Sequence, residues 1–292
     1  MQFESLKVFC DLAESESFSK AARINGVTQS AVSQTVSALE KQFKSLLVER
    51  SKKNFRLTAE GDVVYDYAKR ILQGYGAIQS KLQELKHEIA GEVRVAAVYS
   101  IGLHDLPPYV KRFLKDHPTV KLHIQLRRED KAHEDVISNL VDVGLVAYPT
   151  HDPQVDVVLL RKDPLVLACH PLHPLAKLKM IKIKQLGGQK FVSFEPDMPT
   201  RKAVDRILKD QGAKVEHVLE FDNIETLKRA VENGAGVAIL GEETIRQEVA
   251  HHTLAAVRLE GNPMRQLGAI YKKGKVLSPA MKVFIALLKE DL

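Results

Sequence analysis

The sequence predicts an α/β protein with an all-α N-terminus. Apolar residues recur at helical spacing through roughly the first ninety positions, where strand-like alternation is rare. Beyond Gly91, short apolar runs such as the one from Val93 to Val98 alternate with amphipathic segments, as in a sheet covered by helices. The two patterns meet at Ala90-Gly91, where we place a domain boundary. The length of 292 residues is enough for about two domains.

The composition is typical of a soluble globular protein, with 45% hydrophobic and 27% charged residues. The 43 basic and 37 acidic residues leave a net charge of +6, and an excess this mild matters only where it is concentrated. Cys10 and Cys169 lie too far apart in the sequence to form a disulfide framework or a four-thiolate zinc site. This cysteine usage favours a reducing compartment.

Nothing in the sequence indicates export or membrane insertion. The N-terminal segment contains Glu4 and Asp11 and lacks the basic, then apolar, then small pattern of a signal peptide. No uninterrupted apolar run reaches about 18 residues, the length that a spanning helix needs. We therefore expect a cytoplasmic protein with no membrane partner.

Two short helices are expected first. Ser17 or Ser19 can cap the start of the second helix, and Asn25-Gly26 can form the tight turn that ends it. The apolar positions of these two helices are Leu6, Phe9, Cys10 and Ala13, followed by Phe18, Ala21, Ala22 and Ile24.

A third helix is expected to begin after Thr28, and its two faces differ. Ala31, Val32, Val36, Leu39 and Phe43 are predicted to form its buried face. A helix, a glycine turn and a second helix make a helix-turn-helix, in which the start of the second helix meets base edges in the major groove. Gln can pair with adenine, and Ser can donate or accept a hydrogen bond. The polar residues near this start are Gln29, Ser30, Ser33, Gln34 and Ser37.

A concentrated basic segment follows directly, from Lys41 to Arg56. It could be a solvated basic loop. Next to a groove-reading helix, however, such a cluster is the electrostatic footprint of phosphate contacts, so we favour DNA. Its cations, opposed by the single acid Glu49, are Lys41, Lys44, Arg50, Lys52, Lys53 and Arg56.

Thr58 can cap a long helix with a seven-residue apolar repeat. The spacing alternates between four and three residues over about four repeats, which favours a coiled coil between two chains over a helix that lies on its own domain. Gly74 and Gly76 weaken the helix by about 1 kcal/mol each relative to Ala. The predicted dimerisation positions are Val64, Ala68, Ile71, Tyr75, Ile78, Leu82, Leu85 and Ile89.

The C-terminal two thirds show the alternating pattern of a parallel sheet covered by helices, and they show it twice. This doubling indicates two similar lobes. The first set has strand candidates at 93–98, 120–126, 143–147 and 155–160 and helices near 103–116 and 131–140; the second has strand candidates at 164–169, 190–194, 215–221 and 236–240 and helices near 200–211 and 224–233.

The N-terminal motifs resemble the winged helix-turn-helix of LysR-type transcriptional regulators, and the similarity extends more weakly over the rest of the chain. Two departures stand out: Leu47-Val48-Glu49-Arg50 replaces the usual Leu-Phe-Glu-Arg, and Lys44-Ser45 replaces the usual Gly before it. The matching residues are Phe18-Ser19-Lys20-Ala21-Ala22, Val27-Thr28-Gln29-Ser30-Ala31-Val32-Ser33-Gln34, Leu39-Glu40, Glu49-Arg50 and Leu57-Thr58-Ala59-Glu60-Gly61.

This resemblance implies a domain order and a set of partners. Residues 1–60 would form the DNA-binding domain, 61–90 the linker helix and 91–292 a periplasmic-binding-protein-like effector domain of two Rossmann-like lobes. Lobe I would hold 91–162 and 267–292, with a last helix at 279–290, and lobe II would hold 163–266. The implied partners are promoter DNA, a small-molecule effector, RNA polymerase and further copies in a homodimer or homotetramer. The implied DNA contacts are Thr28, Gln29, Ser30, Ser33 and Gln34, with Arg50 and Lys52 or Lys53 on phosphates.

The effector is expected between the lobes, at the carboxyl ends of the strands, where helix N-termini present free donors. One such loop follows the first strand at Tyr99 to Gly102, and another runs from Phe194 to Arg201. Hydroxyls, backbone amides and a guanidinium would suit a small anionic metabolite. Each side chain also has a structural alternative: a helix cap, a pair with Asp197 or a surface position. The candidate effector residues are Ser100, Ile101, Arg128, Thr200 and Arg201.

We expect no metal, no cofactor and no catalytic residues. Cys169-His170 with His173 does not have zinc-site spacing, and Ser100 lacks the context of a nucleophile elbow. The glycines at 234 and 236 precede a strand, the wrong order for a dinucleotide site. An α/β enzyme would need a convergent acid, base or nucleophile set, and an exported solute receptor would need a secretion signal. A ligand-responsive DNA-binding regulator is therefore the leading interpretation.

Overall fold

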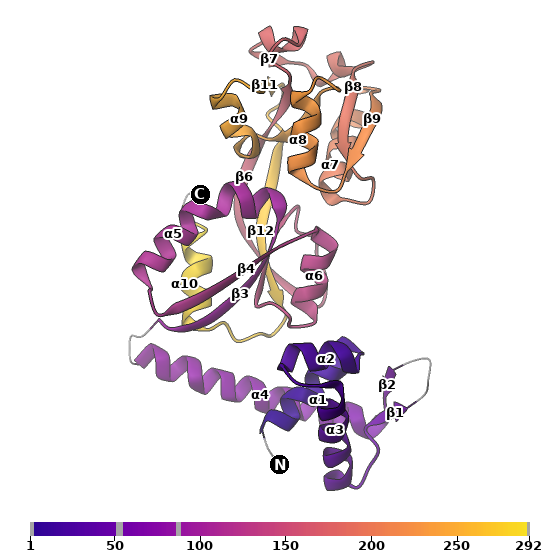
Figure 1. Cartoon of the computed structure of the whole chain (residues 1–292), viewed down its shortest axis with the longest axis vertical. Coiled ribbons are helices and arrows are strands. Elements are labelled where there is room, and N and C mark those ends of the chain that lie inside the picture. The colour runs from indigo at the N-terminus through magenta and orange to yellow at the C-terminus, as the bar shows by residue number, and fades with distance from the viewer. Residues whose placement is uncertain (1–2, 51–54, 86–88, 291–292) are drawn as a thin grey trace.

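The computed structural model describes residues 3–50, 55–85 and 89–290. Three parts follow one another along the long axis in Figure 1: a helical part at the N-terminus, which we call the head (residues 3–57), and two α/β lobes. A long helix runs beside the head and leads to the nearer lobe. In the described part of the chain, no helix combines the length and the apolarity needed to cross a bilayer.

The head packs three helices around one core: α1 (Phe3–Ser15), α2 (Phe18–Asn25) and α3 (Gln29–Phe43). Ser17 caps α2, and Gly26 ends it in the left-handed conformation at φ 64°, as the sequence predicted. Two predicted core positions of α3 differ. Phe43 is 40% exposed, because α3 extends past the other helices at its C-terminal end. Ala31, in the first turn of α3, is half-buried. The buried residues of this core include Leu6, Phe9, Leu12, Ala21, Val32, Val36 and Leu39.

A two-stranded wing follows, in which β1 (Val48–Arg50) pairs antiparallel with β2 (Phe55–Leu57). Val48, which replaces the family's usual Phe, is buried in the head core. The buried Glu40 accepts hydrogen bonds from the backbone N–H groups of Leu47 (3.1 Å) and Val48 (3.4 Å) and so ties the wing to α3. Lys44, at the position of the usual Gly, adopts the left-handed conformation at φ 53° and still ends α3 with hydrogen bonds to two carbonyls.

The long helix α4 (Ala59–Leu85) does not present one continuous dimerisation stripe from Val64 to Ile89, as the sequence predicted. Different parts of that stripe have different surroundings. Ala68 is buried in the head core and Val64 packs against it, whereas Ile89, beyond the helix, packs on lobe I. The side chain of Leu85 lies outside the described residues. A straight helix turns by about 20° per heptad relative to a strict seven-residue repeat, so one apolar stripe cannot face one partner throughout. The exposed members are Ile71, Tyr75, Ile78 and Leu82.

Lobe I has a central sheet in the order β4-β3-β5-β12-β6, covered by helices on both faces (Figure 1). The strand β3 pairs in parallel with β4 and β5, as predicted, but β12 runs antiparallel to β5 and β6, so the sheet is mixed. The elements are β3 (Gly91–Val98), α5 (Leu106–Asp116), β4 (Val120–Arg127), α6 (Glu129–Ile137), β5 (Val143–Ala147), β6 (Val155–Cys169), β12 (Met264–Lys272) and α10 (Pro279–Leu287).

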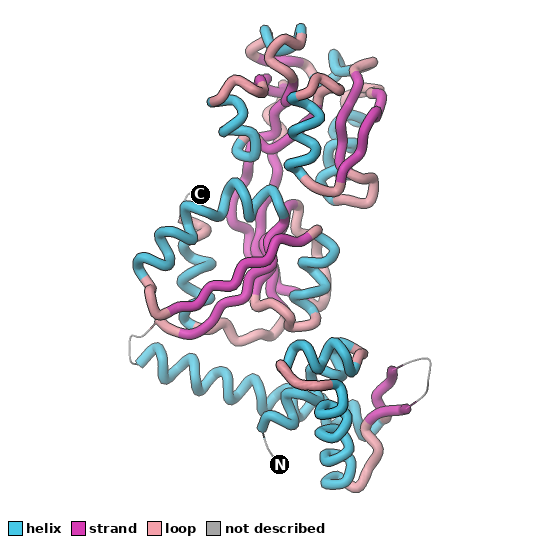
Figure 2. The backbone as a smooth tube through the Cα atoms, viewed as in Figure 1, coloured by secondary structure: helices cyan, strands magenta, loops and turns pink. Residues whose placement is uncertain are grey.

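The two lobes share strands β6 and β12. The sequence indicated separate strands at 155–160 and 164–169, but β6 is a single strand of 15 residues that runs through both lobes (Figure 2). Beyond Pro164 its side chains alternate between two cores: Leu165, Leu167 and Cys169 face one, and Val166 and Ala168 face the other. The charged residues Arg161 to Asp163 and Pro164 interrupt the apolar pattern at the crossing, so the sequence reads as two strands, although the backbone continues as one.

Lobe II is built on the second half of β6. There β10 (Ala238–Gly241) and β11 (Ala255–Leu259) pair antiparallel with β6, and β7 (Met180–Ile181) forms an edge next to β11. The sequence prediction missed β7, β11 and the short helix α9 (Arg246–Ala250). The remaining elements are a parallel pair, β8 (Lys190–Phe194) and β9 (Glu216–Phe221), and the helices α7 (Pro199–Asp210) and α8 (Ile224–Glu232).

Candidate nucleic-acid interface and ligand cleft

The start of α3 presents a polar, uncharged surface to solvent. Gln29, Ser30 and Gln34 are exposed, and Ser33 is half-buried. The hydroxyl of Thr28 accepts a hydrogen bond from the N–H of Ala31 at 3.2 Å, so this residue caps the helix. The opposite face of α3 is held in the head core. The sequence-predicted surface is therefore rigid and open to solvent at its glutamines, as an element that enters a DNA groove must be.

The head also carries exposed cations. Lys41 and Lys44 at the far end of α3 are exposed, and so is Arg56 in the wing. The backbone of Arg50 pairs with Phe55 at the wing tip, but its side chain lies outside the described residues, as do Lys52 and Lys53 entirely. The described cations thus lie at the far end of α3 and in the wing, in the same domain as the polar start of α3, and cations of this kind are the groups that contact phosphates.

A narrow cleft lies between the lobes, with a volume of about 30 Å³. Three of the five predicted effector residues line it: Ser100 and Arg128 from lobe I and Thr200 from lobe II. Asn223, which caps α8, lines it too and was not predicted. The α7 helix begins at this cleft without a side-chain cap, so its first backbone N–H groups remain available to a ligand.

Arg128 joins the lobes across the mouth of this cleft. It stands just before α6 in lobe I, and its guanidinium binds the carboxylates of Glu195 and Asp197 in lobe II. The hydrogen bond to Glu195 raises the pKa of Arg128 above its ordinary value, so this group stays charged. Arg128 therefore connects the two lobes at the edge of this cleft.

Arg265 lies behind Ser100 and contacts it, although it does not itself line the cleft and was not predicted from the sequence. The residue is only 3% exposed, and its Nη1 donates to Ser100 Oγ at 3.0 Å. Its Nη2 donates to Asp163 Oδ2 at 2.8 Å, while its Nε has no partner among the described residues. Burial raises the pKa of the nearby Glu129 carboxyl to about 8 despite the opposing charge of Arg265, so Glu129 is largely protonated at neutral pH.

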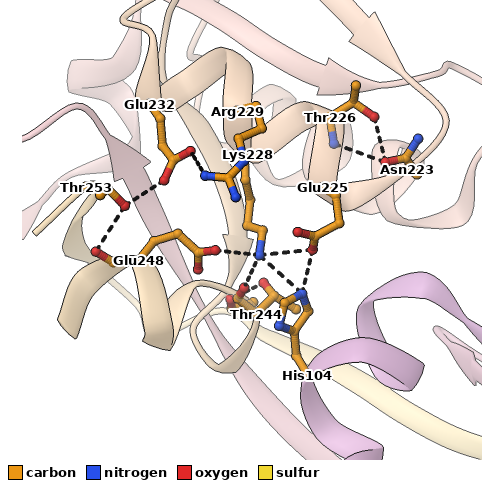
Figure 3. Close-up of polar contacts among 11 residues, drawn as sticks. His104, Asn223, Glu225, Thr226, Lys228, Arg229, Glu232, Thr244, Glu248 and Thr253 are labelled. Atoms are coloured by element: carbon orange, nitrogen blue, oxygen red, sulfur yellow. Dashed lines mark hydrogen bonds and ion pairs between the residues drawn. The ribbon is translucent and has the colours of Figure 1, made fainter. Parts of the chain in front are cut away.

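A second polar cluster joins the lobes beside the cleft (Figure 3). Lys228 of α8 is 2% exposed, and its Nζ lies 2.8 Å from Glu248 and 3.0 Å from Glu225. From lobe I, the Nε2 atom of His104 reaches within 2.7 Å of Glu225 and 3.2 Å of Lys228. His104 lies in a π-helical turn, Ile101–Asp105, that follows Ser100. The cluster thus fixes the position of this turn against lobe II.

The comparisons with known proteins agree with this arrangement. Residues 3–62 match the family described as bacterial regulatory helix-turn-helix protein, lysR family, and residues 86–292 match the LysR substrate binding domain. The chain belongs to the LysR family. It is accordingly a DNA-binding transcriptional regulator with an effector-binding domain, and not an enzyme.

Relatives of this LysR-family chain match it over nearly its whole length. The HTH-type transcriptional regulator CysL of Bacillus subtilis is 27% identical over 100% of this chain and 98% of its own. The RuBisCO operon transcriptional regulator of Allochromatium vinosum is 30% identical over 97% and 94%. Among solved structures, a full-length OxyR variant from Pseudomonas aeruginosa has a TM-score of 0.75 at 20% identity, covering 99% of this chain and 95% of its own.

Two predicted effector residues of this LysR-family regulator lie outside the cleft lining. Ile101 is buried in the core of lobe I. Arg201, in the first turn of α7, is buried; it binds Asp205 at 2.9 Å and Glu220 at 2.8 Å and donates to the carbonyl of Phe194. The sequence places Arg201 next to Thr200, but consecutive helical residues point about 100° apart, so only one of them can face the cleft.

Proposed function

We propose that this regulator binds promoter DNA through the start of α3 and responds to a small anion held between the lobes. The observation that supports the DNA contacts is the uncharged start of α3, where Gln29 and Gln34 are exposed. Exposed cations in the same head, at the far end of α3 and in the wing, are Lys41, Lys44 and Arg56. Glutamine amides supply base-specific hydrogen bonds, and the cations supply affinity that depends on salt.

Replacing Gln29 with Ala is expected to reduce discrimination between DNA sequences. Loss of one bidentate pair with a base is worth about 1–3 kcal/mol, which is roughly 5- to 150-fold in the ratio of affinities. The measurement is genome-wide mapping of sites bound by the wild type, followed by titration of a recovered fragment against random duplex. Gln42→Ala, at the exposed far end of the same helix, is the control and should keep the wild-type ratio. An equal ratio for Gln29→Ala and wild type would contradict the proposed contact.

The proposed ligand is a small oxyanion or carboxylate. Ser100 and Thr200 provide hydroxyls, Arg128 and Arg265 provide charge, and the uncapped start of α7 provides backbone donors. An anion that binds here would compete with Glu195 and Asp197 for Arg128. Ligand binding would then shift the balance between lobe arrangements by its difference in affinity for them. In the complete assembly, that shift would alter the spacing of the DNA-binding heads and the contact with RNA polymerase.

We infer that a second copy of the chain covers the exposed apolar stripe of α4. The exposed fractions of Ile71, Tyr75, Ile78 and Leu82 lie between 45% and 59%. Single exposed apolar residues are common, but four on one helical face are typical of a coiled-coil contact. Val64, Ala68 and Ile89, nearer the ends of the predicted seam, already pack against this chain itself. A homodimer through the middle and end of α4 is therefore the proposed assembly, with a homotetramer as a further step.

Replacing Ile78 with Glu is expected to weaken this pairing, because the charge would be buried in the contact. Light scattering coupled to size exclusion should show a shift from dimer or tetramer toward smaller species at micromolar concentration. Ile78→Leu retains the apolar contact and serves as the control. An oligomer unchanged by Ile78→Glu would show that this stripe is not the contact.

A thiol-based response is not supported. Cys10 and Cys169, the chain's two cysteines, are both buried. Burial raises the pKa of Cys10 to about 12 and that of Cys169 to about 11. Because the thiolate is the reactive form, neither group is suited to oxidative sensing at neutral pH.

A further inference from the structure

We propose that Glu14 is a positioning residue that fixes the head on lobe I, and that strand β12 links this contact to the interlobe cleft. The proposal concerns how the DNA-binding surface is held, and only its second readout rests on the proposed function.

The Glu14 carboxylate gathers donors from three parts of the chain. It lies on α1 of the head and accepts a hydrogen bond from Tyr65 of α4 at 3.0 Å, and Lys69 of α4 forms an ion pair with it. From lobe I, Asn139 donates its amide at 2.8 Å, and Lys272 at the end of β12 forms a second ion pair. One carboxylate therefore connects the head, the linker helix and the effector domain.

This carboxylate is well shielded from solvent. The side chain of Glu14 is 4% exposed and that of Lys272 is 15% exposed. Burial opposes ionisation of Glu14, but the charges of Lys272 and Lys69 hold its pKa below the ordinary value. Burial also lowers the pKa of Lys272, against the attraction of Glu14. Removing one member would leave a buried charge without its partner, so the cluster favours one orientation of the head strongly.

The surrounding contact between head and lobe I is hollow. A cavity of about 680 Å³ lies there, with walls from α1, α4 and lobe I. Most of its other charged groups pair within their own walls: Asp11 with Lys7 in the head, and Asp142 with Arg94 and Lys275 in lobe I. Because so few side chains pack in this interface, a few polar contacts set the orientation of the head on lobe I. The contacts of Glu14 with Asn139 and Lys272 cross the interface.

Strand β12 carries groups at both of these places. Arg265, near its start, lies beneath Ser100 in the cleft, and Lys272, at its end, binds Glu14. At about 3.3 Å per residue, the two positions are roughly 23 Å apart. The strand pairs with β6 along this length and with β5 over four residues, so it is a rigid element of the sheet. A movement of the lobes that displaces Arg265 would reach Lys272, and with it the head.

The test is a charge swap in the full-length protein. Glu14→Lys alone places three lysines together, and Lys272→Glu alone places two carboxylates on one lysine. The double variant again has one carboxylate and two lysines, with Lys69 unchanged. Glu14→Gln is a milder variant that keeps an acceptor for Tyr65. Lys273→Glu is the control, because Lys273 is exposed, lines the same cavity and undergoes the same change of charge, but is not one of the donors to Glu14.

Two readouts decide the outcome. Hydrogen–deuterium exchange in segments 136–142 and 269–275 should be faster in the single variants than in the control and should return to wild type in the swap. Affinity for a genomic fragment bound by wild type should fall about tenfold in the singles and recover in the swap, the size of an ordinary coupling between sites.

Exchange in the single variants equal to that of Lys273→Glu, or not restored by the swap, would overturn the proposal. If hydrogen–deuterium exchange became faster in the single variants while their DNA affinity stayed at the wild-type value, the positioning role would be overturned. Glu14 would then make only a structural contact. If the wild-type protein bound no genomic fragment, the proposed DNA contacts would be wrong. The exchange measurement would still test the contact of Glu14 with lobe I, because it does not depend on DNA.

Discussion

Arg265→Met is expected to destabilise the effector domain by about 3–5 kcal/mol, the usual cost of removing one partner from a buried ion pair. Asp163 is 4% exposed and binds the Arg265 guanidinium at 2.8 Å. Asp105, also buried, lies 3.7 Å from the same group. Without Arg265, the Asp163 carboxylate would remain buried without its charge partner. Gly241 is packed against this pair, since a Cβ there would lie 2.1 Å from Asp163 Oδ2, so little rearrangement is available.

The measurement is the free energy of unfolding in denaturant. Arg258→Met, at an exposed position on β11, is the matched control and should change stability by less than about 0.5 kcal/mol. A second measurement is the shift in melting temperature with a panel of small carboxylates, phosphate and sulfate. Anions that stabilise wild type and the Arg258→Met variant should not stabilise Arg265→Met. Wild-type stability of Arg265→Met would show that the pair contributes little.

Gly61→Ala is expected to destabilise the head by about 2–3 kcal/mol, in the upper range for forced overpacking, and to abolish sequence-specific DNA binding. A Cβ at Gly61 would lie 2.1 Å from the carbonyl oxygen of Leu47. The same carbonyl oxygen accepts a hydrogen bond from the backbone N–H of Thr58, so it cannot move aside without shifting the wing. The start of α4 would have to move away from the segment that leads into β1.

The matched control is Gly76→Ala, on the same helix, where a Cβ would meet nothing within 4 Å. This change should stabilise α4 by about 1 kcal/mol, because Ala is the better helix former. Thermal unfolding of the two variants, followed by helical circular dichroism, should move in opposite directions. Equal melting temperatures would show that the wing yields easily at Leu47.

Several features of the site could be predicted because their causes are local. Thr28 caps α3, Gly26 provides the left-handed turn, and Gln29 and Gln34 face solvent, all as expected from capping preferences and helical periodicity. Ser100 and Thr200 were found because ligands bind where strands end and helices begin. Each of these inferences uses residues only a few positions apart.

Other features depended on partners distant in sequence. Arg201 was predicted to line the cleft, but its ion pair with Glu220 of β9 keeps its side chain away from it. Arg265 was not predicted, because its partner Ser100 is 165 residues away in the sequence. Glu14 gave no signal in its own surroundings, because its partner Lys272 belongs to the last strand.

The sequence by itself determined the helix-turn-helix, the capped starts of its helices, the exposed polar start of α3 and the division into a helical head and an α/β part. Only the tertiary structure decided that β6 is one strand through both lobes, that the linker seam is covered at its ends by its own chain, and which arginine lies under the cleft. The physical reason is range: periodicity and capping act within a turn or two of backbone, while buried charges are placed by whichever partner the folded chain brings to them.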